Sequence, residues 1–178
     1  GRLMVFFDQD RWLADNGDYT KRLDYSLNSD SVVVDLGGYR GDFANNIYSK
    51  FNCNVYVFEP FKEFYDVIAG RFNSNEKIRA FNYGISDKTS TQEFYFCNDG
   101  SSLVEVQRFS EEENMPVSSV EVRSFTEVYK ELNFDVIDLL KINVEGSEYE
   151  ILENIFENNY TTKIKNFQIQ FHPEPPGA

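Results

Sequence analysis

An acid followed by a run of glycines is the stretch of this sequence best suited to bind a ligand. Asp35 closes the apolar run Val32-Val33-Val34, and Gly37, Gly38 and Gly41 follow it. Glycines at such a turn let the backbone approach a ligand closely at the carboxyl end of a strand. Because the Asp35 carboxylate would face that ligand and repel a phosphate, the pattern favours a ligand with a cationic group.

S-adenosylmethionine carries an ammonium and a sulfonium group, and D-x-G-G-x-x-G is the glycine turn of methyltransferases that use it. The dinucleotide fingerprint fits less well, because Leu36 takes the place of its first glycine when Gly38 and Gly41 are aligned to the other two. An NAD-dependent oxidoreductase is therefore the weaker alternative. A tight strand-to-helix turn without any ligand also stays open.

A second acid, Glu59, ends the next apolar run. It follows the glycine turn by about 20 residues, the interval at which an acid at the end of the second strand hydrogen-bonds a ribose diol. A solvated strand end is the plain alternative. Farther along, Asn82 and Asp87 lie in a loop that would overhang the adenine end of such a pocket. Either could hydrogen-bond the adenine amine, and Ser86-Asp87 could equally start a turn.

A third group of polar residues stands at the end of a later apolar run. Lys141, Asn143 and Glu145 alternate there, so they project to the same side of a strand. Buried charges are costly unless paired, so this group is either a reaction site or a structural Lys141–Glu145 ion pair. His172 directly follows the last apolar run, on the ligand side of an open α/β sheet. Its imidazole could serve as a general base, with Glu145 as the second candidate, or it could be structural.

Only a parallel sheet would bring these residues to one edge. Alternating apolar and helical stretches predict an open, mostly parallel α/β sheet with helices on both faces. The expected strands are 32–34, 54–59, 77–82, 136–142 and 165–171, and the expected helices are 42–50, 61–70, 126–132 and 147–156. Residues 91–97 and 117–125 alternate and predict an inserted antiparallel hairpin. Residues 1–30 indicate a polar helical lead-in, with a short strand at 4–7 as the alternative, before a single domain over 31–178.

Composition narrows the class of protein. The chain has 178 residues and a net charge of −13, which disfavours a nucleic-acid partner. Its two cysteines match no zinc spacing and predict a reduced, cytoplasmic protein. No apolar run has the length of a membrane span. The single histidine excludes a multi-histidine metal centre, and we expect no metal site.

The motifs D-L-G-G-x-x-G-D-F, V-F-E-P, G-S-S-L and K-I-N-V-E-G-S-E, in this order and followed by a strand that ends in histidine, resemble those of the FkbM-type S-adenosylmethionine-dependent methyltransferases. The resemblance covers roughly residues 31–172. It implies a class I, Rossmann-like fold and methylation of a hydroxyl on a sugar, polysaccharide or small-molecule acceptor. It further implies a methionine end of the cofactor pocket at Asp35, Gly37, Gly38 and Gly41, a ribose contact at Glu59, and a reaction side lined by Lys141, Glu145, Glu148 and His172. Asn143 is counted with the cofactor-binding residues, as are Asn82 and Asp87.

The sequence departs from the family pattern at three places. Asn143 and Gln170 stand where the family usually has acids, which weakens any expectation of a divalent cation. These changes leave open a degenerate cofactor-binding or scaffold module with little turnover. The chain also ends before the last two strands of class I methyltransferases. Their absence would leave a sheet edge exposed, and a second copy of the chain could pair with it.

Overall fold

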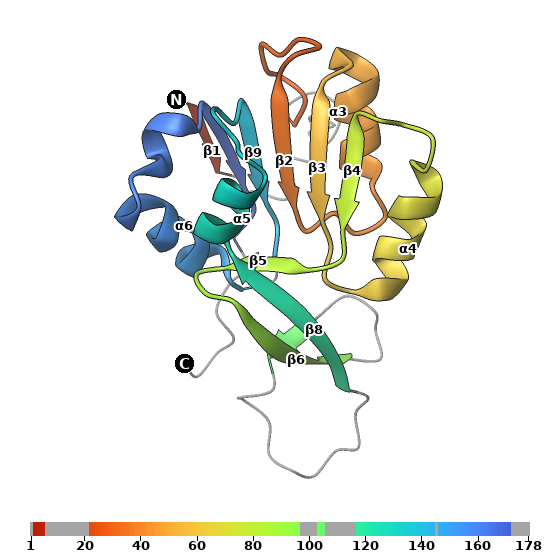
Figure 1. The fold of residues 1–178 in the computed structure, drawn as a ribbon, viewed down its shortest axis with the longest axis vertical. Helices are drawn as coiled ribbons and strands as arrows, with labels where there is room; N and C mark the ends of the chain where they lie inside the picture. Colours follow the sequence, from red (N-terminus) through yellow and green to blue (C-terminus); the bar gives the residue numbers. More distant parts are fainter. Residues whose placement is uncertain (1, 6–21, 97–102, 106–116, 145, 172–178) are drawn as a thin grey trace.

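The computed structural model describes residues 2–5, 22–96, 103–105, 117–144 and 146–171. Its main layer is a six-stranded sheet in the order β1-β10-β9-β2-β3-β4, with every neighbouring pair parallel. Figure 1 shows this sheet with a smaller sheet beyond the carboxyl ends of its strands. The open parallel α/β fold predicted from the sequence is therefore confirmed.

The central strands form where both faces can be buried. They are short runs rich in valine, isoleucine and leucine, which suit a sheet covered on both sides. Their bounds are β2 Val32–Leu36, β3 Asn54–Phe58, β4 Ile78–Phe81, β9 Leu139–Ile142 and β10 Asn166–Ile169. The chain runs from β2 outward to β4 and returns to place β9 on the other side of β2, so the strand order reverses between β2 and β9.

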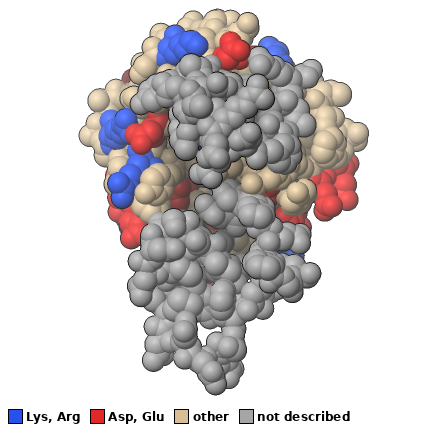
Figure 2. All heavy atoms as spheres, turned by 180° about the vertical axis from the view of Figure 1, so that it is seen from behind, with Lys and Arg blue, Asp and Glu red and all other residues tan. Residues whose placement is uncertain are grey.

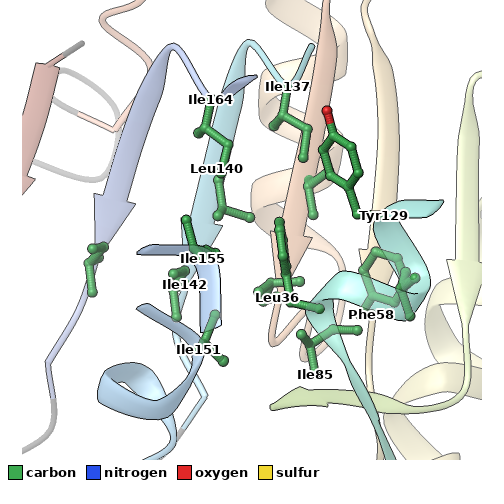
Figure 3. Close-up of a cluster of buried hydrophobic side chains, with 14 residues drawn as sticks. Leu36, Phe58, Ile85, Tyr129, Ile137, Leu140, Ile142, Ile151, Ile155 and Ile164 are labelled. Carbon is green, nitrogen blue, oxygen red and sulfur yellow. The ribbon is translucent and has the colours of Figure 1, made fainter. Parts of the chain in front are cut away.

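Two helical layers cover the sheet. One face carries α3 (Asp42–Phe51) and α4 (Lys62–Arg71), and the other carries α5 (Phe125–Glu131) and α6 (Glu148–Glu157). Alternate residues of each strand enter separate cores, because successive side chains point to opposite faces. Figure 3 shows the core on the α5 and α6 side, where Leu36 and Leu140 of the sheet meet Ile151 and Ile155 of α6.

A second sheet lies beyond the carboxyl ends of the strands of the first (Figure 1). It has the order β5-β8-β6-β7, formed by β5 Gly84–Ser86, β6 Ser90–Phe96, β7 Leu103–Glu105 and β8 Val117–Ser124. Strands β6 and β8 are antiparallel, as the alternating runs predicted, and β5 pairs with β8 in parallel. Val120 and Val122 of β8 form a small core with Phe61 and Phe64, which anchors this sheet at the start of α4.

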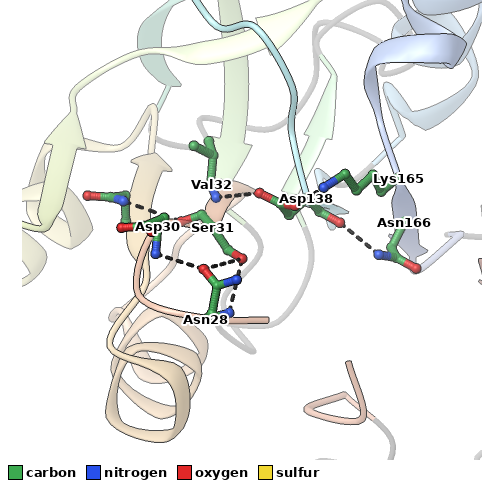
Figure 4. A network of polar contacts seen from close by, with 8 residues as sticks. Asn28, Asp30, Ser31, Val32, Asp138, Lys165 and Asn166 are labelled. Atoms are coloured by element: carbon green, nitrogen blue, oxygen red, sulfur yellow. Dashed lines mark hydrogen bonds and ion pairs between the residues drawn. The ribbon is translucent and has the colours of Figure 1, made fainter. Parts of the chain in front are cut away.

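A polar network holds the opposite, amino-terminal edge of the main sheet. Asp138 accepts the Val32 N–H at 2.8 Å and pairs with Lys165 at 2.7 Å, while its own carbonyl accepts from Asn166 at 2.8 Å. Figure 4 shows these bonds joining the chain segments of β2, β9 and β10. One aspartate thus sets the register of three strands whose far ends carry the candidate site.

The amino-terminal region corrects one expectation. Arg2–Val5 is strand β1 and pairs in parallel with β10. The helical lead-in predicted for residues 1–30 is therefore wrong at its start, and the alternative of a short strand is closer. A free backbone edge at β10 favours pairing over helix formation there. Residues 22–31 contain turns but no helix, and residues 6–21 lie outside the described ranges.

The pairing of β1 with β10 bears on the expectation of an exposed sheet edge. Strand β1 covers the side of the last strand, β10, and itself forms the outer edge of the sheet there. Pairing with a second copy of the chain stays a prediction. The G-S-S turn before Leu103 lies outside the described residues.

Among the helices of the described ranges, none has the length and apolar character needed to cross a membrane.

Candidate functional site

The glycine turn lies at the point where the strand order of the sheet reverses, which is where open α/β sheets bind ligands. It leaves β2 at Gly37, whose φ of 84° is left-handed. The N–H groups of Gly37 and Gly38 both donate to the Phe58 carbonyl, at 3.0 and 3.2 Å. A Cβ on Gly37 would lie 1.9 Å from the Asn143 carbonyl oxygen. Only glycine therefore lets the ends of β2, β3 and β9 meet here.

Asp35 lies beneath this turn and not at its surface. Its side chain is 0% exposed, and its Oδ1 accepts from Lys141 Nζ at 2.6 Å. The position of Asp35 at the end of an apolar run predicted that its carboxylate would face a ligand. Instead it faces Lys141 across neighbouring strands, because the two residues are direct partners in the β2–β9 register. Burial raises the pKa of Asp35, and the Lys141 ammonium group opposes that rise.

Lys141 is tied to the turn as well as to Asp35. Its Nζ donates to the Gly37 carbonyl at 3.0 Å, and the residue is 5% exposed. Lys141 thus forms a structural ion pair with Asp35. The Lys141–Glu145 pair that the sequence left open involves a residue outside the described ranges. Through its two bonds, Lys141 joins β9 to the turn that follows β2.

Residues 22–25, which precede β2, contact β10 and the residue that follows it. Tyr25 donates its hydroxyl to Gln168 at 2.9 Å, and the Arg22 guanidinium donates to Gln170 at 3.1 Å. Arg22, Gln168 and Gln170 border a cavity of about 10 Å³, about the size of a single water. Lys141 and Asn143 line the same cavity. The Asn143 Oδ1 atom is buried and accepts no hydrogen bond from any residue that the structure describes. Asn143 thus carries acceptor capacity at the carboxyl end of β9.

Glu59, directly after β3, accepts hydrogen bonds from the glycine turn and from the start of α4. Its carboxylate accepts the Tyr39 N–H at 2.8 Å through Oε2 and the Phe61 N–H at 3.0 Å through Oε1. It therefore links the turn after β2 to the start of α4. Glu59 is 4% exposed, and burial raises its pKa to about 7 against the opposing effect of the two backbone donors.

Tyr39 occupies the middle of the turn. Its φ is 50°, and its side chain is 51% exposed. Its ring centroid lies 4.6 Å from that of Phe64 on α4. Tyr39 is not among the site residues predicted from the sequence. The available signal was a bulky residue standing between glycines, where a turn favours glycine or asparagine.

The two residues predicted at the adenine end are separated. Asn82 donates to the carbonyls of Glu59 and Pro60 at 3.1 and 3.0 Å, so it braces the loop that carries Glu59. Asp87 accepts from the Ser86 hydroxyl at 3.1 Å, and its own carbonyl accepts from Asn154 of α6. Asn82 therefore belongs with Glu59, and Asp87 lies against the helical layer on the other face of the sheet.

Of the residues predicted to line the reaction side, Lys141 and Glu148 lie in the described ranges. Glu148 begins α6 and is 1% exposed, and its carboxylate accepts the Gly146 N–H at 3.0 Å. This bond folds the turn after β9 back onto the helix. The two residues named as candidate bases, Glu145 and His172, lie outside the described residues.

Two comparisons with known proteins bear on this arrangement. Residues 35–176 match the family profile described as the methyltransferase FkbM domain. This range begins at Asp35 and includes the glycine turn, Glu59 and the β9 segment. The search of curated proteins found no match.

Proposed function

The chain belongs to the FkbM methyltransferase domain family, and from that membership we propose that it transfers a methyl group from S-adenosylmethionine to a hydroxyl of a sugar, polysaccharide or small-molecule acceptor. One observation carries the choice of cofactor. A buried acid at the end of β3 grips the glycine turn that follows β2, at the reversal of strand order. This is the position from which a carboxylate receives a ribose diol in such sheets.

The residues present fit that cofactor. Glu59 uses two of about four acceptor positions on its backbone donors, which leaves capacity for two ribose hydroxyls. At each of the three glycines of the turn, a Cβ would lie under 3.0 Å from another protein atom, so the glycines let the turn pack tightly beside Glu59. The buried Asn143 Oδ1 has no donor among the described residues, and it is an acceptor suited to an ammonium group at the methionine end. Asn82 would hold the adenine end through its support of Glu59 and Pro60.

S-adenosylmethionine supplies a methyl group activated by its sulfonium charge. The protein's part is to align an acceptor hydroxyl with that methyl group and to remove the hydroxyl proton. We assign proton removal to His172, whose ordinary pKa lies near neutrality, with Glu145 as the second candidate. Lys141 contributes by holding the glycine turn in place through Asp35 and the Gly37 carbonyl.

Calorimetric titration with S-adenosylhomocysteine, the demethylated product, tests the cofactor assignment. We expect micromolar binding by the wild-type chain. Glu59→Gln should weaken binding by about tenfold or more, since an amide replaces one ribose acceptor with a donor. Glu63→Gln, a change on the first turn of α4 just beyond Glu59, serves as the control and should bind as the wild type does. Wild-type binding by Glu59→Gln would remove the ribose assignment.

A transfer assay then separates an enzyme from a degenerate module. Isotope-labelled methyl donor is supplied with a panel of sugars, polysaccharides and small hydroxylated compounds. We expect label in at least one acceptor, lost in His172→Ala with little change in S-adenosylhomocysteine affinity. Cofactor binding without transfer to any member of the panel would favour the scaffold alternative that Asn143 and Gln170 suggest.

A further inference from the structure

Tyr39 holds a backbone conformation that its residue type disfavours. Among the described residues, the non-glycine residues with positive φ are Tyr39, Asn52, Asn133 and Asn159. Asparagine is the residue, after glycine, that most readily adopts the left-handed region, because its short polar side chain can bond locally. Tyrosine has no such compensation. The chain thus places a strained aromatic residue where asparagine would suit the turn better.

The turn itself does not require the tyrosine ring. The Tyr39 N–H donates to Glu59, and the Gly41 N–H donates to the Gly38 carbonyl at 2.8 Å. Both bonds use backbone donors, so asparagine at position 39 would keep them. The strain therefore persists for the sake of the side chain, and strained residues of this kind concentrate at ligand sites.

The ring is held on one side and open on the other. It lies 4.6 Å from the Phe64 ring, and Phe64 contacts Phe61, whose N–H is the second donor to Glu59. The Arg40 guanidinium lies 5.2 Å from the centre of the Tyr39 ring. Even with these contacts, Tyr39 is 51% exposed. The part of Tyr39 that these contacts leave exposed is available to a ligand bound beside Glu59, to which the Tyr39 N–H donates.

We propose that the Tyr39 ring packs against the nucleoside part of the cofactor, next to the ribose held by Glu59. This inference rests on the proposed function and adds a binding residue to it. Phe64 acts as a positioning residue that sets the direction of the Tyr39 ring. The strained backbone keeps the ring in place before the ligand arrives, which reduces the ordering that binding would otherwise require.

The test compares ligand affinity and stability in three variants. Tyr39→Asn removes the ring and relieves the backbone, and Tyr39→Phe keeps the ring. Phe156→Asn removes another exposed aromatic residue, from the last turn of α6 on the opposite face of the sheet. Each protein is titrated with S-adenosylhomocysteine in a calorimeter, and its thermal unfolding midpoint is measured without ligand.

We expect Tyr39→Asn to bind about tenfold more weakly, the usual loss when an aromatic platform for a base is removed. Its unfolding midpoint should stay equal to the wild-type value or rise, because asparagine tolerates the left-handed conformation. Tyr39→Phe should bind within about twofold of the wild type, and Phe156→Asn should bind unchanged. Weaker binding by Tyr39→Asn without a lower unfolding midpoint would show that the ring contacts the ligand and does not merely support the fold.

Wild-type affinity in Tyr39→Asn would overturn the proposal. A lower unfolding midpoint together with weaker binding would also overturn it, because the ring would then act by supporting the fold. Failure of the wild-type chain itself to bind S-adenosylhomocysteine would instead refute the proposed cofactor, and the inference about Tyr39 would fall with it.

Discussion

Glu59 is a carboxylate whose surroundings favour its neutral form. It is 4% exposed, and burial raises its pKa from the ordinary 4.5 to about 7. Its two backbone donors favour the charged form but do not outweigh the loss of hydration. The folded protein therefore binds a proton at Glu59 in a pH range where the unfolded chain has released it.

This difference predicts how stability depends on pH. Because the folded state holds more protons than the unfolded state between pH 4.5 and 7, Glu59 makes the free energy of unfolding fall as pH rises through this range. The expected loss is on the order of 3 kcal/mol. Urea denaturation of the wild type and Glu59→Gln at half-unit pH steps measures it. The variant should show a smaller fall over this range, and parallel curves for the two proteins would contradict the assignment.

Asp35 and Lys141 are buried as an ion pair, whereas the buried Glu59 carboxylate is bonded to backbone donors. Each is the other's ion-pair partner, at 2.6 Å, and both are nearly inaccessible to water. Breaking such a pair leaves a buried charge, which is more costly than replacing both partners together. The pair therefore commits β2 and β9 to one register at the point where the glycine turn begins.

The turn between β2 and α3 is tightly constrained by its glycines. Gly37 has a positive φ and faces the backbone of Asn143, whereas Gly70 lies exposed on α4 with open space around its missing Cβ. The two glycines therefore differ in whether a side chain would fit. One is required by close approach of strands, and the other only adds flexibility to a helix.

The same substitution should therefore have opposite effects at the two positions. Gly37→Ala should lower the free energy of unfolding by about 2–4 kcal/mol, from left-handed strain and the clash with the Asn143 carbonyl. Gly70→Ala should raise it by about 0.5–1 kcal/mol through helix propensity. Chemical denaturation of both variants beside the wild type measures this. Equal effects of the two changes would show that the turn can relax, contrary to its geometry.

At the scale of the whole molecule, acidic charge dominates. The sequence carries 30 Asp and Glu against 17 Lys and Arg. Figure 2 shows basic and acidic side chains interspersed on the face it displays. Surface pairs such as Lys62–Asp66, at 2.7 Å, are worth little each, so they do not offset the repulsion of a net charge of −13.

Salt should consequently stabilise the folded protein at pH 7.5. The screening length falls from about 30 Å at 0.01 M to about 10 Å at 0.1 M, which weakens repulsion between distant acids. We expect the free energy of unfolding to rise by about 1 kcal/mol, or the thermal midpoint by about 2–4 °C, between these NaCl concentrations. Scanning calorimetry measures the shift, with equal concentrations of sucrose as the uncharged control. A midpoint that falls with NaCl would show that local ion pairs outweigh the net charge.

The alternation of short apolar runs with helical stretches was enough to predict the parallel sheet, the order of its main elements and the antiparallel β6–β8 pair, because strand and helix periodicity are local properties of the chain. The positions of Asp35, Gly37 and Glu59 at strand ends were likewise readable from spacing. Only the tertiary structure decided that Asp35 faces Lys141, since that contact depends on the register of two strands far apart in sequence. It also decided that β1 covers the β10 edge and that Tyr39 bears the strain of the turn. Contacts across strands and the backbone angle of a single residue follow from packing of the whole fold, which no local pattern contains.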